Sequence, residues 1–193
     1  MPELENAEIL KRIAELEARQ RHSEDRQAIL DCIMLYTRAI DRHEWSLLEE
    51  VYHPDGIANH GDFVGDRAAL RDFLEPMYHA NYAIHTHHVM NHLCEIDGDV
   101  AHAETTALVM MALKDGTHVN MLGARYIDRF ERRDGRWKIA LRRIVSDFRC
   151  RAEQLPNYAN FPNGRWDRED LSYERPVALP AALRQQVKRG RAG

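Results

Sequence analysis

The spacing of apolar residues divides the chain into a helical first part and a strand-like second part. In the first part, apolar side chains recur among Glu, Lys and Arg at the three- to four-residue spacing of amphipathic helices. Ser23 and Asp66 stand directly before two of these patterns and are suited to cap the helices that follow. The predicted helices are residues 3–20, 24–41, 44–52 and 67–78.

From residue 84 onward, apolar and polar residues alternate with the period of a half-buried β-strand. Asp-Gly pairs separate these runs and favour tight hairpin turns. A further turn is predicted at His53-Pro54-Asp55-Gly56, where it ends the third helix and leads into a short strand. The predicted strands are residues 57–64, 84–96, 100–113, 117–132 and 136–149.

Helices followed by an antiparallel meander predict an α+β fold rather than a parallel α/β sheet. Four long strands must bury one face, and their natural twist curves the sheet around that face. Residues 151–193 follow neither period, and their prolines and aromatic residues favour a tail that lies on the domain or on a neighbouring subunit. We therefore predict an N-terminal helical extension over 1–22, a domain over 23–150 and a C-terminal extension over 151–193.

Composition and charge exclude several classes of protein. The 193 residues are 44% hydrophobic and 30% charged, which suits one folded domain and not a disordered chain. A net charge of -4 argues against nucleic acid as the main partner, and no apolar run approaches the length of a membrane helix. The N-terminus has no secretory signal, and the three cysteines are widely spaced, so we expect a reduced, cytoplasmic protein.

Histidines gather in the first long strand and are the main candidates for chemistry. Alternation places His85 and His87 on one face and His88 and His92 on the other, so one pair faces the interior of the curved sheet. A histidine there can act as a base near neutral pH. A His-x-His pair can also chelate a metal, but the sequence offers no third ligand. The remaining alternative is a histidine without a role, which we prefer for His88 and His92 and leave open for His85.

Asp41 lies at a position where an acidic side chain destabilises the helix. It follows the apolar stripe of the second helix, and a carboxylate at a helix C-terminus opposes the helix dipole. This predicts a specific partner, although a solvated acid in a turn is the alternative. Tyr36 can line the same cavity only if the helix ends or distorts near Asp41. His60 is a polar residue in a predicted strand or belongs to an exposed loop, and Trp45 is most simply a core residue.

Several site chemistries are absent from the chain. It has no glycine-rich phosphate loop, no G-x-S-x-G elbow, no H-E-x-x-H motif and no dinucleotide fingerprint. The residue types that remain support acid–base catalysis without a cofactor or a metal.

Six short segments follow one another along the chain in a familiar order. They are Tyr36-x4-Asp41-x3-Trp45, Phe63-Val64-Gly65, His87-His88, Ile96-Asp97-Gly98-Asp99, Tyr126-Ile127-Asp128-Arg129-Phe130 and Asp134-Gly135-Arg136-Trp137. Through these segments, residues 24–149 resemble the SnoaL-like branch of the nuclear transport factor 2-like superfamily, which contains scytalone dehydratase and bile-acid 7α-dehydratase. The resemblance implies a cone-shaped α+β barrel, in which a strongly curved, mostly antiparallel sheet packs on N-terminal helices around a pocket. Enzymes of this branch work without cofactors, and relatives are often trimers or dimers, so a homo-oligomer is expected.

The resemblance also implies roles for single residues. Asp41 and His87 fall on an Asp–His dyad that abstracts a proton, and a small register error would move this role from His87 to His85 or His88. Tyr36 matches the tyrosine of the bile-acid enzyme, and His60 occupies the place of a tyrosine in scytalone dehydratase.

The chain departs from the family pattern at two strands. Some relatives carry a His or Asp on the second long strand, where this chain has Val109, Met110 and Met111. The bile-acid enzyme has an arginine on the last strand where this chain has Ser146, with Arg142, Arg143 and Arg149 nearby. The methionines suggest an apolar, adaptable wall that suits an aromatic or steroid-like substrate.

We therefore predict a cofactor-independent lyase, of the dehydratase or formaldehyde-releasing type, for a small hydrophobic substrate. Asp41, His87 and Tyr36 are its predicted catalytic residues. The alternatives are a non-catalytic ligand-binding or oligomer-supporting protein of the same fold, and an isomerase or cyclase. The predicted substrate contacts are His60, His85, Trp45, Met110 and Arg143.

Overall fold

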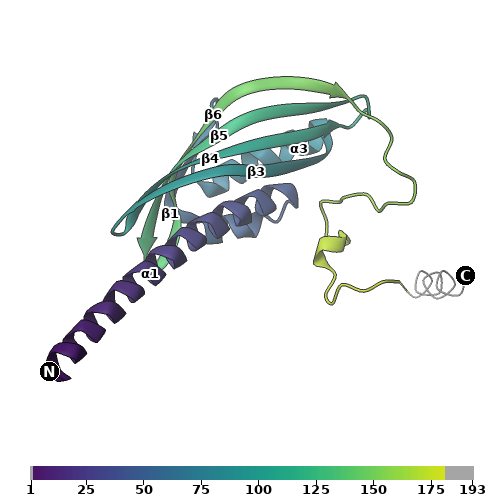
Figure 1. Ribbon diagram of the computed structural model, residues 1–193. Coiled ribbons are helices and arrows are strands. Elements are labelled where there is room, and N and C mark those ends of the chain that lie inside the picture. Colours follow the sequence, from purple (N-terminus) through teal and green to yellow (C-terminus); the bar gives the residue numbers. More distant parts are fainter. Residues whose placement is uncertain (1, 181–193) are drawn as a thin grey trace, which may run out of the picture.

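The computed structural model describes residues 2–180, with side chains from residue 6 onward, and its first element is a single long helix (Figure 1). This helix, α1, runs from Pro2 to Asp41, so the prediction of two separate helices is wrong. Ser23 does not cap a helix, because its hydroxyl donates a hydrogen bond at 3.1 Å to the Arg19 carbonyl one turn earlier. No Gly or Pro stands between the two apolar stripes, so nothing interrupts the helix there.

The connection from α1 to the sheet is more irregular than predicted. The segment 44–52 forms only a 3₁₀ turn and one turn of α-helix, and the predicted turn over 53–56 lies inside a strand. The register of that strand shifts between Tyr52 and Ile57, so Pro54-Asp55-Gly56 forms a bulge. The elements are η1 Trp45–Leu47, α2 Leu48–Val51, β1 Tyr52–Asn59 and β2 Val64–Gly65.

The next helix, α3, runs from Arg67 to Asn81 and begins as the sequence predicts. The Asp66 carboxylate accepts hydrogen bonds from the backbone N–H groups of Ala68 and Ala69 at 3.0 and 2.9 Å. The helix ends three residues later than expected and buries Leu70, Leu74 and Tyr78.

The four long strands are confirmed, and they form one sheet with β1 and β2. The strand order is β2-β1-β6-β5-β4-β3, and all pairs are antiparallel except β1 with β6. The predicted α+β class is therefore confirmed, although β2 and β3 are free edges and the curved sheet does not close into a barrel. The long strands are β3 Tyr82–Asp97, β4 Val100–Leu113, β5 His118–Arg133 and β6 Arg136–Glu153.

The core lies between the concave face of the sheet and the helices. Figure 1 shows the long strands arching over α1 and α3, while the N-terminal half of α1 extends away from them. Ile29, Ile33, Tyr36 and Ile40 form the buried stripe of the C-terminal half of α1. Burying one large apolar side chain contributes about 1.5–3 kcal/mol, so this stripe accounts for the position of α1 under the sheet.

The tail after β6 returns to the C-terminal end of α1. The Tyr173 hydroxyl donates to the Glu44 carboxylate at 3.1 Å, and Trp166 stacks on His43 with ring centroids 4.1 Å apart. These two aromatic residues lie on the domain as expected, whereas Tyr158 and Phe161 are exposed. Within the described part of this tail, Leu171–Tyr173 form a 3₁₀ turn, η2.

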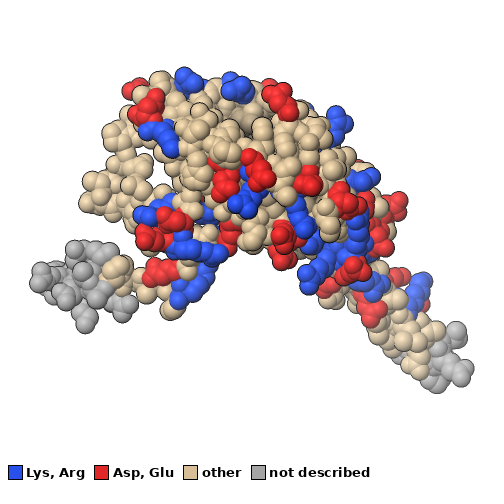
Figure 2. All heavy atoms as spheres, turned by 180° about the vertical axis from the view of Figure 1, so that it is seen from behind, with Lys and Arg blue, Asp and Glu red and all other residues tan. Residues whose placement is uncertain are grey.

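Two further features concern the surface. Figure 2 shows acidic and basic side chains intermixed on the face seen from behind, in keeping with the small net charge. Among the described helices, none has the length and the apolar composition that a bilayer crossing requires.

Candidate active site

A cavity of about 190 Å³ lies between the concave face of the sheet and helices α1 and α3. Most of its walls are apolar, and the lining side chains with nitrogen or hydroxyl groups are Tyr36, His60, Tyr78, His87 and Tyr126. The cavity is lined by Tyr36, His60, Phe73, Leu74, Met77, Tyr78, His87, Val109, Met111, Leu122, Ala124, Tyr126 and Ile144.

Asp41 and His87 meet at this cavity, 46 residues apart in the chain. Asp41 is the last residue of α1, and the backbone turns sharply after it because His43 takes a positive φ of 50°. The Asp41 Oδ1 atom lies 2.5 Å from His87 Nδ1, and Oδ2 accepts the backbone N–H of His87 at 2.8 Å. The Asp41 side chain is 13% exposed, so it is a buried partner of His87 and not a solvated acid.

The same contacts set the protonation of the pair. Burial alone would raise the pKa of Asp41, but the hydrogen bonds from the ring and backbone of His87 outweigh burial and lower the pKa below its usual value. Asp41 is therefore a carboxylate at neutral pH, and it accepts the Nδ1–H of His87. This arrangement leaves His87 Nε2 as the unprotonated nitrogen that can face a ligand in the cavity.

His85 shares the inward face of β3 with His87 but is not among the residues that line the cavity. Its ring is fully buried, stacks on Tyr78 at 3.9 Å and lies 3.0 Å from the Ile40 carbonyl through Nε2. Burial and the neighbouring His87 lower the pKa of His85 to about 4, so the ring is neutral and Nε2–H donates. The His85 and His87 rings make separate contacts, His85 with the Ile40 carbonyl and His87 with the Asp41 carboxylate.

Tyr36 and His60 lie next to each other in the lining of the cavity. The Tyr36 hydroxyl lies 3.4 Å from His60 Nε2, and both residues line the cavity. Burial raises the pKa of Tyr36 to about 12, so its hydroxyl stays protonated and can donate. Burial and the nearby Arg142 lower the pKa of His60 to about 3, so that ring is neutral. Because α1 ends at Asp41, Tyr36 and the Asp41–His87 pair reach the same cavity.

Three other predicted substrate contacts lie elsewhere. Trp45 is half-buried beside His43, with ring centroids 5.1 Å apart, and does not line the cavity. Met110 points to the outer face of β4, because its neighbours Val109 and Met111 both line the cavity. Arg143 is exposed on the outer face of β6.

Arg142, and not Arg143, is the arginine inside the fold. Its Nε and Nη2 atoms bind the Asp128 carboxylate at 2.8 and 2.7 Å, and both side chains are fully buried. Its guanidinium lies 4.1 Å from the ring centroids of Tyr36 and Tyr126. The ion pair therefore holds two of the cavity-lining tyrosines in place.

A β-bulge decides which of the two neighbouring arginines faces inward. Trp137 and Ile139 face inward, so a regular strand would turn Arg143 inward as well. The register of β5 against β6 shifts where Phe130 pairs with Ile139 and Arg129 with Leu141, so one residue is inserted and Arg142 faces inward. Such a shift leaves no clear signal in the sequence. Strand alternation alone could have identified Met111, rather than Met110, as the methionine that faces the cavity, because Met111 and Val109 are two positions apart and share one face of β4.

Comparisons with known proteins agree with this geometry. The model of the SnoaL-like domain family matches residues 21–143, which is more than half of the chain. The chain belongs to the SnoaL-like family. No curated protein matches the sequence.

Solved structures of low sequence identity share the fold of this SnoaL-like chain. Hexachlorocyclohexane dehydrochlorinase LinA-type3 from Novosphingobium barchaimii is 19% identical, with a TM-score of 0.62 over 74% of this chain and 97% of that one. A scytalone dehydratase candidate from Novosphingobium aromaticivorans is 20% identical, with a TM-score of 0.60 over 75% and 96%. A Mycobacterium tuberculosis protein of unknown function is 26% identical, with a TM-score of 0.58 over 66% and 75%.

Proposed function

We propose that this protein is a cofactor-independent lyase, of the dehydratase or formaldehyde-releasing type, for a small hydrophobic and aromatic substrate. The observation that carries the proposal is the contact between Asp41 and His87 at the wall of an apolar cavity. Membership of the SnoaL-like family supports it, as do two neighbours in fold whose names denote eliminations, a dehydrochlorinase and a dehydratase candidate.

In this mechanism His87 is the general base. Its Nε2 removes a proton from the substrate while Asp41 holds Nδ1–H and stabilises the imidazolium that forms. In a dehydration, the electrons of the broken C–H bond form the new double bond, and the leaving hydroxyl departs with the electron pair of its C–O bond and takes up the proton that His87 holds, so that water is released. In a formaldehyde release, His87 takes the proton of a terminal O–H, the adjacent C–C bond breaks as the C=O of formaldehyde forms, and the electrons of the C–C bond form the double bond as the leaving hydroxyl departs in the same way. Tyr36 or His60 donates a hydrogen bond to the oxygen of the leaving hydroxyl.

The volume of the cavity bears on the substrate. Apolar cavities of about 150 Å³ are large enough for one benzene ring. At about 190 Å³, this cavity suits a substrate with a single ring and is small for a steroid nucleus. We therefore propose a one-ring aromatic alcohol, and we place its leaving group near Tyr36 and His60.

The proposed setting is the cytoplasm. Cys32, Cys94 and Cys150 are all free thiols, which suits a reducing compartment. The proposed partners are the small substrate and further copies of the same chain, and not nucleic acid or a membrane.

Replacement of His87 by Gln tests the role of the base. A panel of one-ring aromatic alcohols is incubated with the wild-type protein, and products are identified by mass spectrometry. We expect products that have lost water or formaldehyde, and we expect kcat to fall by about 10²–10⁴-fold in His87→Gln, the usual contribution of general acid–base catalysis. The kcat of Asp41→Asn should also fall, because an amide cannot stabilise the imidazolium as a carboxylate does.

His88→Gln is the matched control, since His88 is the next residue but is exposed on the other face of β3. It should keep wild-type turnover. Turnover of His87→Gln near that of the wild type would reject the mechanism. A product with the mass of its substrate would indicate an isomerase or cyclase, and tight binding without any product would indicate a non-catalytic protein.

A further inference from the structure

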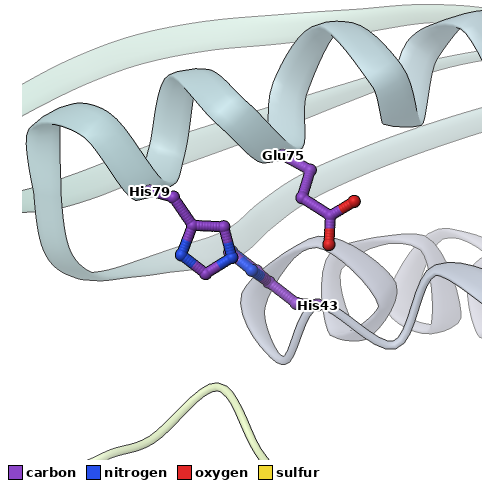
Figure 3. Close-up of side chains that lie close together, drawn as sticks. All are labelled: His43, Glu75 and His79. Atoms are coloured by element: carbon purple, nitrogen blue, oxygen red, sulfur yellow. The ribbon is translucent and has the colours of Figure 1, made fainter.

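A second group of chemically reactive side chains lies outside the cavity, on the other side of the turn that follows Asp41. Figure 3 shows His43 coming from this turn and Glu75 and His79 coming from α3, with all three directed toward one another. One ligand atom from each residue lies within 4.8 Å of the other two. His43, Glu75 and His79 do not line the cavity of the proposed active site.

His43 is the most unusual member of this group. Both of its ring nitrogens are buried and have no hydrogen-bond partner among the described residues. A buried polar group without a partner destabilises the fold, and a ligand that binds it removes this cost. The backbone of His43 has a φ of 50°, a region that favours glycine, yet the chain has a histidine at this position.

The surroundings of His43 hold its ring in one orientation. Trp166 stacks on one face, with ring centroids 4.1 Å apart and an angle of 18° between the planes. His79 meets the ring edge-on, with centroids 4.8 Å apart and an angle of 87°. The ring is therefore held next to His79 in a fixed position.

Glu75 and His79 complete the group from one face of α3. They are four residues apart, the spacing that places two side chains next to each other on a helix. Arg71 donates to Glu75 Oε2 at 3.1 Å. His79 is exposed, so an ion could reach the group from solvent.

We propose that His43, Glu75 and His79 bind a divalent transition-metal ion of the zinc type. Two imidazoles and one carboxylate are a typical donor set for Zn²⁺, with a water molecule in the fourth position, whereas Mg²⁺ and Ca²⁺ prefer oxygen donors alone. Zn–N bonds of about 2.0–2.1 Å require ligand atoms about 3.3 Å apart in a tetrahedral site. The present separations are within 4.8 Å, so the three side chains have to move closer together when the ion binds.

The bound ion would join the turn after Asp41 to the helix that covers the cavity. His43 is two residues from Asp41, and Phe73 and Met77 of α3 line the cavity next to Glu75. The ion would therefore act as a structural clamp between α1 and α3 and would not touch the substrate.

Zinc binding is tested on the full chain without an affinity tag. The protein is freed of metal with a chelator, dialysed, and titrated with Zn²⁺ by calorimetry, and bound metal is counted by elemental analysis. We expect one Zn²⁺ per chain. We expect His79→Ala to lose at least about 100-fold in affinity, because even the loss of a group that supports a ligand costs 10–100-fold.

His102→Ala is the matched control, since His102 is exposed on β4 and lies outside the group. It should bind Zn²⁺ as the wild type does, and Mg²⁺ should not compete. Co²⁺ should give ligand-field absorption bands in the wild type that are lost in Glu75→Gln. A wild-type protein that binds no Zn²⁺, or a His79→Ala variant that binds it with unchanged affinity, would overturn the proposal.

Discussion

Neighbouring histidines on β3 differ in role because they differ in contacts. His87 is bound to the Asp41 carboxylate and faces the cavity, whereas His85, on the same face, is fully buried on Tyr78 and the Ile40 carbonyl. His88 points the other way and is exposed. Residue type alone does not separate these three rings, but burial and the hydrogen-bond partner do.

The buried His85 predicts a loss of stability in acid. Its pKa is about 4 in the folded protein and about 6.5 in the unfolded chain, so the unfolded chain binds more protons between these values. The contribution of His85 to the free energy of unfolding should therefore be complete above pH 6.5 and should decrease as the pH drops toward 4. For His85 alone, the loss between pH 7 and pH 5 is about 2 kcal/mol.

His85→Gln isolates this contribution. Glutamine keeps an N–H group near the Ile40 carbonyl and does not titrate, so its loss of stability between pH 7 and pH 5 should be smaller than that of the wild type by about 2 kcal/mol. Urea unfolding at the two pH values measures the difference. His43 and His60 also titrate with lowered pKa values, but they are present in both proteins and cancel in the comparison. Equal losses in the two proteins would show that His85 is not the group responsible.

At the scale of elements, the site depends on where helices and strands end and shift. Helix α1 carries the buried stripe of the core and also ends at Asp41, so the same element builds the fold and delivers the carboxylate. The bulge in β6 turns Arg142 inward to Asp128 and fixes two cavity tyrosines. Helix α3 covers the cavity with one face and carries Glu75 and His79 on another.

The start of α3 gives a prediction about stability. Asp66 satisfies two backbone N–H groups at the N-terminus of this helix, and loss of such a cap costs about 1 kcal/mol. Asp66→Ala should lower the free energy of unfolding by that amount in a chemical denaturation experiment. Asp72→Ala removes an exposed carboxylate from the same helix and should have little effect. An Asp66→Ala protein as stable as Asp72→Ala would show that the cap contributes nothing.

At the scale of the whole molecule, the outer face of the sheet carries several partly exposed apolar side chains among its charged ones. Leu108 and Met110 lie on this face of β4, and Phe148 of β6 packs over Gly123 while remaining 56% exposed. An antiparallel sheet with one solvated face normally carries polar residues there. A second copy of the chain is the partner that we expect on this face.

Light scattering coupled to size-exclusion chromatography tests the assembly. The wild type should have the mass of a dimer or a trimer of the 22.5 kDa chain. Phe148→Glu places a charge in the expected interface and should shift the mass toward that of one chain. Val64→Glu introduces the same charge at an exposed apolar residue on the edge strand β2 and should leave the mass unchanged. A monomeric wild type, or an oligomer unaffected by Phe148→Glu, would contradict an interface on this face.

Much of the fold could be predicted because its signals are local. The apolar period separates helices from strands within a few residues, Asp66 marks the start of α3, and Asp-Gly pairs mark hairpins, where Gly98 and Gly135 take the positive φ that such turns require. The boundary at Ser23 was wrong because a serine can satisfy its hydroxyl within a continuing helix.

The pairing of Asp41 with His87 could be inferred only with the help of the family resemblance, and its geometry needed the folded chain. Local spacing does not encode contacts between residues that are 46 positions apart. A single inserted residue in a strand exchanges the inner and outer faces, as it does for Arg142 and Arg143. The meeting of His43 with Glu75 and His79 likewise follows from the packing of a turn against a helix. The sequence by itself therefore determined the order and type of most elements, whereas the tertiary structure decided which side chains share a site, because that depends on register and on packing at long range.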